Sequence, residues 1–137
     1  MACFWIGVAH ARQVELIRGK GLVAFSKGQK APVAKMQVGD GVLYYAPRND
    51  FEGEAVQAFI ALATVTGDSP FETPLMADAK AWVRAADYAE TGEAPIRPMI
   101  PDLSFIKKPS HWGMAFRRSH FEIPEADFGR IQAAMAE

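Results

Sequence analysis

Aromatic side chains flank a short basic segment of this chain. Phe25 precedes the segment that holds Lys27 and Lys30, and further rings fall on or beside predicted strands: Trp5, Tyr44, Tyr45, Phe59 and Trp112. Planar rings stack on a nucleobase, polar groups read the edge of the base, and lysines hold the flanking phosphates. The pattern therefore predicts a nucleobase pocket, although the same rings could instead fill a small hydrophobic core.

Nucleophilic and metal chemistry have little support in the sequence. Cys3 and His10 lie seven positions apart, so a regular strand would place them on opposite faces. The histidines are scattered, and there is no Cys-X-X-Cys or His-X-His pair. The glycines at 19–21 and 39–41 lack the further residues of a phosphate-binding loop. We therefore expect no catalytic residue, no metal and no cofactor.

The charged residues are unevenly distributed. Residues 1–48 hold seven basic and two acidic side chains, a net charge of +5, whereas residues 49–137 hold eight basic and fourteen acidic ones, a net charge of −6. Within the acidic part, the stretch from Leu103 to Phe121 contains four basic residues and no acid. A molecule with a total charge near zero can therefore present one positive face, which favours an anionic partner.

Length and composition limit the class of protein. A chain of 137 residues fits a single domain, residues 1–137, and buries roughly two-thirds of its unfolded surface without disulfides. Its one cysteine excludes an internal disulfide and favours a reducing compartment. No apolar run approaches the ~20 residues that cross a membrane, and the amino-terminal residues do not resemble a signal peptide. We expect a cytoplasmic protein without a membrane segment, and a monomer rather than an oligomer.

Periodicity predicts short strands with few helices. Strands are expected over 4–9, 22–26, 42–46, 57–66 and 82–88, and two short strand pieces are expected at 112–116 and 120–123. Helices are expected over 12–18 and after Pro124, where Phe128, Ile131 and Met135 form a buried stripe. The segment 27–30 is predicted as a basic loop, followed by a turn at Pro32, and 95–101 as an extended, proline-rich connection. This is an α+β pattern, typical of a small mixed barrel or curled sheet of five or six strands with two or three flanking helices.

Blocks distributed along nearly the whole chain resemble the single-domain EVE family. They are Phe4–Ala9, Gly28–Met36, Val38–Asp40, Leu43–Pro47, Gln57–Phe59, Ala94–Pro98, Leu103–Ile106 and His111–Gly113. No single block is diagnostic, and their order makes the resemblance specific. The resemblance implies a PUA-like curled β-barrel related to the YTH reader domain. It also implies recognition of a modified base in DNA or RNA.

The resemblance also implies which residues form the site. The base-binding pocket would be lined by Ala9, His10, Phe25, Ser26, Lys30, Tyr45, Pro47 and Phe59. Trp112 could line it too, because it lies amid basic residues. Adjacent phosphates would be held by Lys27, Lys30, Arg48 and Arg97. YTH modules carry a cage tryptophan where this chain has Phe25 and Ser26, so the preferred base stays open.

Two other functions remain compatible with the sequence. A small enzyme could act on a nucleotide-like ligand with His10 as general base, which would require a carboxylate or metal partner. A protein-interaction module could use Trp82 and Tyr88 as an exposed patch. Convergence of Phe25, Tyr45 and Phe59 on an open cavity, with Lys30 at its rim, would favour the base reader.

Overall fold

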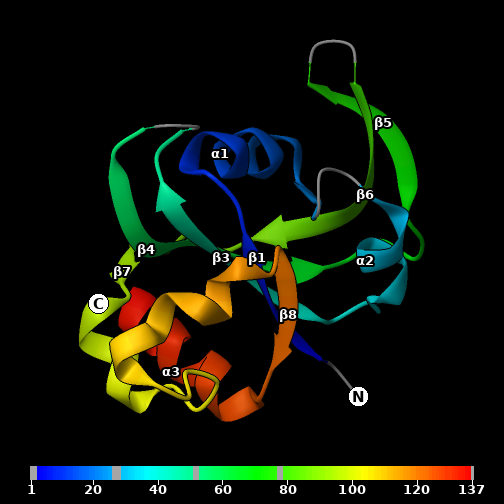
Figure 1. The fold of residues 1–137 in the computed structure, drawn as a ribbon. Coiled ribbons are helices and arrows are strands. Elements are labelled where there is room, and N and C mark those ends of the chain that lie inside the picture. Colours follow the sequence, from blue (N-terminus) through cyan, green and yellow to red (C-terminus); the bar gives the residue numbers. More distant parts are fainter. Residues whose placement is uncertain (1–2, 26–28, 51–52, 77–78, 137) are drawn as a thin grey trace.

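The strands form one mixed, curled sheet (Figure 1). The computed structural model describes residues 3–25, 29–50, 53–76 and 79–136. The strands are β1 (Phe4–Val8), β2 (Leu22–Val23), β3 (Gly41–Arg48), β4 (Ala55–Val65), β5 (Phe71–Met76), β6 (Ala79–Tyr88), β7 (Ala94–Pro95) and β8 (His120–Ile123). The order across the sheet is β2-β6-β4-β3-β1-β8, with β5 paired to β6 and β7 paired to β4. Strand β1 runs parallel to β3, and the other pairs are antiparallel.

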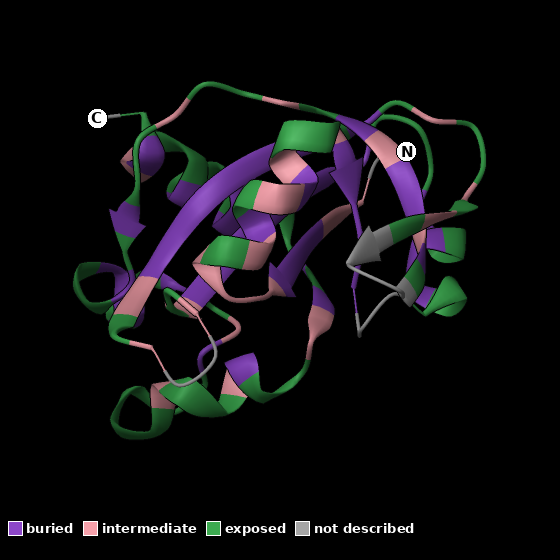
Figure 2. Cartoon of the chain, turned by 90° about the horizontal axis from the view of Figure 1, so that it is seen from above, coloured by how far each residue is buried: buried purple, intermediate pink, exposed green. Residues whose placement is uncertain are grey.

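Helices cover both faces of the sheet. They are α1 (Ala11–Lys20), α2 (Lys30–Lys35), α3 (Glu125–Met135) and the 3-10 helices η2 (Arg97–Asp102) and η3 (Pro109–Arg117). Figure 2 shows α1 lying over buried strands, with exposed residues on its outer side. The helix α3 and the 3-10 segments lie on the other side of the sheet from α1 (Figure 1). The predicted stripe of α3 is confirmed, because Phe128, Ile131 and Met135 are all buried.

Two hydrophobic cores result from this arrangement. The first core lies under α1 and α2 and includes Trp5, Val14, Ile17, Val33 and Tyr44. The second core lies against α3, η2 and η3 and includes Ile6, Leu43, Tyr45, Phe59 and Phe128. Consecutive residues of β1 and β3 alternate between the two cores, as side chains of an extended strand must. Both strands are therefore covered on both faces, which explains their continuous apolar runs.

A bulge in β4 changes which face Phe59 occupies. Tyr44 pairs with Ala61. The next residue, Tyr45, pairs with Phe59, which leaves Ile60 without a cross-strand partner. Simple alternation predicts Phe59 on the same face as Ala61. That prediction is wrong, because the extra residue moves Phe59 into the second core while Ala61 stays in the first.

Three local predictions are also corrected by the structure. The basic loop ends earlier than predicted, because α2 begins at Lys30 and places Pro32 in its first turn, where a missing N–H costs nothing. The segment 112–116 belongs to η3 instead of a strand, and it carries Trp112 and Phe116 on the same side, against the second core. The proline-rich connection contains β7 and η2. The strand β5 is not predicted at all.

Two buried charged residues hold the segments around the first core. The guanidinium of Arg84, in β6, donates to four backbone carbonyls, two at α2 and two in the turn before β5. The carboxylate of Asp40 accepts hydrogen bonds from the backbone N–H of Cys3 and from the indole Nε1 of Trp5, at 2.9 and 3.1 Å. Polar groups buried in this way must be hydrogen-bonded, so both residues fix the positions of their neighbours.

Candidate functional site

Several strands of the sheet begin or end side by side, at one end of the strands and not along an outer strand. Because β1 and β3 are parallel, with Val8 opposite Tyr45, their carboxyl ends lie at the same edge. Strand β8 starts there too, with His120 opposite Gly7, and β4 begins there because it is antiparallel to β3. We call this region the strand-end edge; it includes Ala9, His10, Pro47, Ser119 and His120. Four of the predicted site residues, Ala9, His10, Tyr45 and Pro47, belong to it or adjoin it.

Backbone hydrogen bonds fasten the strand-end edge. The N–H of Val8 donates to the carbonyl of Ser119 at 2.8 Å, and the N–H of Ala9 donates to the carbonyl of Tyr45 at 3.2 Å. His10 is extended and occupies the N-cap position of α1, so the chain turns from β1 directly into the helix. These bonds join the segments of the strand-end edge through main-chain groups.

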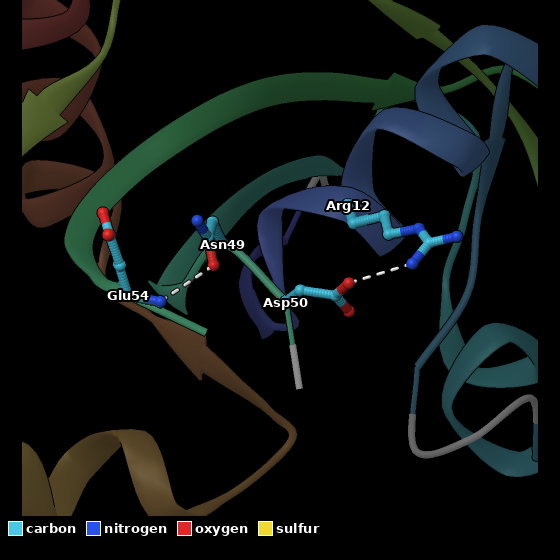
Figure 3. A network of polar contacts seen from close by, with 4 residues as sticks. All are labelled: Arg12, Asn49, Asp50 and Glu54. Carbon is cyan, nitrogen blue, oxygen red and sulfur yellow. Dashed lines mark hydrogen bonds and ion pairs between the residues drawn. The ribbon is translucent and has the colours of Figure 1, made fainter. Parts of the chain in front are cut away.

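The loop between β3 and β4 is tied to the start of α1. The side chain of Arg12 forms an ion pair with Asp50 at 2.9 Å, and the N–H of Glu54 donates to Asn49 Oδ1 at 3.0 Å (Figure 3). Arg48, a predicted phosphate contact, donates to the carbonyl of Gly53 at 2.7 Å. The Arg12–Asp50 pair is largely exposed to solvent, so it contributes little to stability and mainly orients the loop.

Phe25 lies in the first core, below the strand-end edge. Its ring is 4% exposed and stacks on Tyr44, with the ring centroids 5.6 Å apart. The ring of His120 is tilted relative to that of Phe25, with the ring centroids 5.8 Å apart. The hydroxyl of Tyr44 accepts from the N–H of Ala24 and donates to its carbonyl, which fixes the ring that supports Phe25.

Tyr45 and Phe59 do not join Phe25. Both belong to the second core, on the opposite face of the sheet, and they are 2% and 0% exposed. Tyr45 stacks on Phe116 with the centroids 4.0 Å apart, and Phe59 meets Tyr45 edge-on at 5.5 Å. The three rings therefore do not converge on one open cavity, which is the arrangement that would have favoured the base reader. Strand alternation separates Phe25 from Tyr45, and the β4 bulge moves Phe59 to the second core.

The other predicted residues fall into two groups. Arg97 and Trp112 come together, because the guanidinium lies 5.6 Å from the centroid of the indole ring. Lys30 lies instead on the other side of the sheet, with its ammonium 4.7 Å from the ring centroid of Trp82. Ser26 and Lys27 lie outside the described residues.

A basic hollow beside η3 was not among the predicted sites. It has a volume of about 320 Å³, and its lining includes Phe105, Lys107, Lys108, His111, Trp112 and Arg118. The sequence did carry a signal for it, since the stretch from Leu103 to Phe121 contains no acidic residue. Only the structure shows that these cations surround a concave surface with an aromatic wall.

His120 lies at the strand-end edge and was not among the predicted site residues. Its ring lies 6.5 Å from Trp5 and 5.8 Å from Phe25, so it covers the outer side of the first core. Partial burial, together with the charges of Lys35 and Arg118, lowers the pKa of His120 below 6.5. The imidazole is therefore neutral at pH 7, and a neutral flat ring suits contact with a base.

The lowered pKa of His120 predicts a pH dependence of stability. The unfolded chain binds a proton near pH 6.5, whereas the folded protein does so only at lower pH. The contribution of His120 to stability is therefore complete above pH 6.5 and is lost as the pH falls through the folded-state pKa. Urea unfolding above and below pH 6.5 should show a smaller acid-induced loss for His120→Gln than for wild type. Equal losses would contradict this assignment.

Neither a metal site nor a membrane-spanning helix is found among the residues that the structure describes. Among them, no group of three or more His, Cys, Asp or Glu side chains is close enough to hold a metal ion. None of the helices in the described ranges is long and apolar enough to cross a membrane.

The patch proposed for protein contacts is not exposed. Trp82 and Tyr88 are both half-buried, and the hydroxyl of Tyr88 donates to the carbonyl of Leu22 at 2.7 Å.

Solved structures share this arrangement of strands and helices. The protein Rpa0253 from Rhodopseudomonas palustris superimposes with a TM-score of 0.60 at 14% identity, over 98% of this chain and 93% of that chain. A hypothetical protein from Leishmania major gives a TM-score of 0.56 at 11% identity, over 97% and 94%. At these identities the likeness concerns the fold alone. The fold is thus a mixed α+β one, with a sheet curled into a half-barrel.

Sequence comparison defines the family within that class. A family model described as EVE domain matches residues 3–134. The chain is 35% identical over 133 residues to a UPF0310 protein of Mycolicibacterium vanbaalenii, covering 96% of this chain and 91% of that protein. It is 31% identical over 133 residues to the UPF0310 protein YdcG of Bacillus subtilis, with the same coverage. The chain belongs to the EVE domain family.

Proposed function

We propose that this protein is a binding module for nucleic acid and that it accepts a modified base at the strand-end edge. In this proposal the base contacts the rings of His10 and His120, above Phe25, and no bond is made or broken. Nearby phosphates are held by cations such as Arg48 and Arg97. The relatives' names state no function, so the proposal rests on the site and on the family.

The observation that carries this proposal is the meeting of flat side chains and positive charge at one edge. His120 lies half-buried against Phe25 and Trp5, and both Lys35 and Arg118 are near enough to lower its pKa. A ring held in this way offers a stacking surface at little entropic cost. Stacking on one ring contributes about 1–3 kcal/mol per base, and cations near the base attract its phosphates.

Binding to matched oligonucleotides tests the proposal. Short single-stranded DNA and RNA with one cytosine or adenine, either plain or methylated, would be titrated at two salt concentrations. We expect tighter binding to one methylated form, and binding of all forms should weaken as salt rises. We expect His120→Ala to reduce the preference for the methylated form, because a stacking surface is removed.

A control variant separates local from general effects. Gln132→Ala changes an exposed residue of α3, the helix that packs on the second core, and should bind like wild type. Equal affinity for plain and methylated oligonucleotides would contradict base reading and leave a general nucleic-acid module. Turnover of a nucleotide substrate would favour the enzyme alternative, and the absence of any binding would contradict the proposal as a whole.

A further inference from the structure

The basic hollow beside η3 has the features of a binding site for a nucleotide. Three of its cations, Lys107, Lys108 and Arg118, come from both sides of η3. The rings of Phe105 and Trp112 contribute flat apolar surface to the same volume of about 320 Å³. A ligand that matches this surface carries a negative charge and a planar apolar group, which is the chemistry of a nucleotide.

The positive charge of the hollow is not balanced locally. Within the described part of the chain, the ion pairs are Arg12–Asp50 and Arg18–Glu15, and neither involves the hollow. The guanidinium of Arg118 lies over the ring of Phe121, 4.8 Å from its centroid, and this contact leaves its charge in place. Lysines and arginines without acidic partners around a concave surface attract an anion.

Trp112 is held in position by its neighbours before any ligand arrives. It meets Phe116 edge-on with the ring centroids 6.2 Å apart, and Phe116 in turn stacks on Tyr45. The Arg97 guanidinium lies near the indole, 5.6 Å from its ring centroid. The indole is half-buried, so it can present part of its surface to the hollow at a low cost in side-chain entropy.

The hollow and the strand-end edge are neighbours, because consecutive residues of the chain belong to each of them. Arg118 is followed directly by Ser119, whose carbonyl accepts the N–H of Val8 at the end of β1. Consecutive Cα atoms are about 3.8 Å apart, so Arg118 stands beside that edge. Arg118 also contributes to the lowered pKa of His120, which shows that its charge reaches the edge.

We propose that the hollow beside η3 binds a nucleotide that neighbours the one at the strand-end edge. Its phosphate contacts Lys107, Lys108 and Arg118, and its base lies against Trp112. This inference rests on the proposed function for the identity of the ligand as nucleic acid. It adds a second, sequence-tolerant subsite, which supplies affinity while the strand-end edge supplies selectivity.

Charge-matched variants test the phosphate contacts. Lys107→Gln with Lys108→Gln removes two charges from the hollow, and Lys20→Gln with Lys80→Gln removes two charges from exposed positions in α1 and β6. For an unmodified single-stranded oligonucleotide we expect about tenfold weaker binding of the first variant relative to the second. The slope of log affinity against log salt should fall by about 1.4 for two lost contacts. Equal affinities and slopes would overturn the proposal.

The tryptophan indoles report on the base contact. In NMR titrations with the same oligonucleotide, the indole N–H signal of Trp112 should shift, whereas that of Trp5 should stay, because it is buried and bonded to Asp40. Trp112→Leu should weaken binding about 5- to 150-fold, the range typical of losing one stacked base. A saturable titration that leaves the Trp112 signal in place would overturn the proposal.

Mononucleotides separate this inference from the proposed function. Adenosine 5′-monophosphate should shift the Trp112 signal saturably and more strongly than adenosine, which lacks the phosphate. If no oligonucleotide binds but the monophosphate does so, the proposed function fails and the hollow remains a nucleotide site. If methylated oligonucleotides are preferred but neither probe moves Trp112, the hollow fails and the reader remains.

Discussion

Replacement of Arg84 by leucine should lower the free energy of unfolding by about 3–5 kcal/mol. Arg84 is 4% exposed, and its guanidinium donates to the carbonyls of Val33 and Met36, at α2, and of Gly67 and Asp68. Leucine would leave these acceptors without their donor, and a buried acceptor without a partner costs about 1–3 kcal/mol. The measurement is urea unfolding of both proteins at one pH and temperature.

The control for Arg84 lies in the same strand. Lys80→Leu also replaces a cation by leucine, but its side chain is exposed, so we expect a change within about 0.5 kcal/mol. Arg84→Lys should be intermediate, because one ammonium cannot span two segments as the planar guanidinium does. If Arg84→Leu unfolded at the same urea concentration as Lys80→Leu, the four hydrogen bonds would not be holding α2 and the turn before β5 to β6.

Replacement of Gly7 by alanine should cost about 1–3 kcal/mol of stability and weaken modified-base selectivity at the same time. An added Cβ would lie 2.6 Å from Cε1 of Phe25 and 2.7 Å from Cε1 of Tyr44, closer than such atoms approach in proteins. Tyr44 cannot retreat easily, because its hydroxyl is bonded to both backbone groups of Ala24. Overpacking of this kind typically costs 1–3 kcal/mol, and it would displace the ring of Phe25.

Gly129 provides a control in which the same substitution should raise the stability of the protein. It lies within α3, and a Cβ added there would have no atom within 4 Å. Gly129→Ala should therefore stabilise the protein by about 0.5–1 kcal/mol through the higher helix propensity of alanine. Thermal unfolding of both variants gives the comparison. If Gly7→Ala were as stable as wild type, the close packing of Phe25 and Tyr44 against β1 would be wrong.

Strong local patterns made much of the fold predictable. The apolar run at β1, the strand β6 and the stripe of α3 all appear in the structure where the sequence indicates them. The short helix α2 and the helix η3 were not predicted, because their residues take that shape only when they pack. Val33 in α2 and Phe116 in η3 are buried against strands far away in the sequence.

The site was only partly predictable, for a related reason. A sequence shows that Phe25, Tyr45 and Phe59 are aromatic, and it does not show which face of the sheet each one reaches. One unpaired residue in β4, Ile60, is enough to reverse the face of Phe59. The pairing of Arg97 with Trp112 depends in the same way on how η2 and η3 pack against each other.

By itself, the sequence determined the α+β class, the family and the regions of excess positive charge, because composition, periodicity and the order of motifs are properties of the chain. The tertiary structure decided which rings are buried in a core and which cations surround a hollow. Those outcomes depend on strand register, on the bulge in β4 and on contacts between distant segments. Such contacts form only when burial of apolar surface outweighs the entropy of ordering the chain, and no local pattern records that balance.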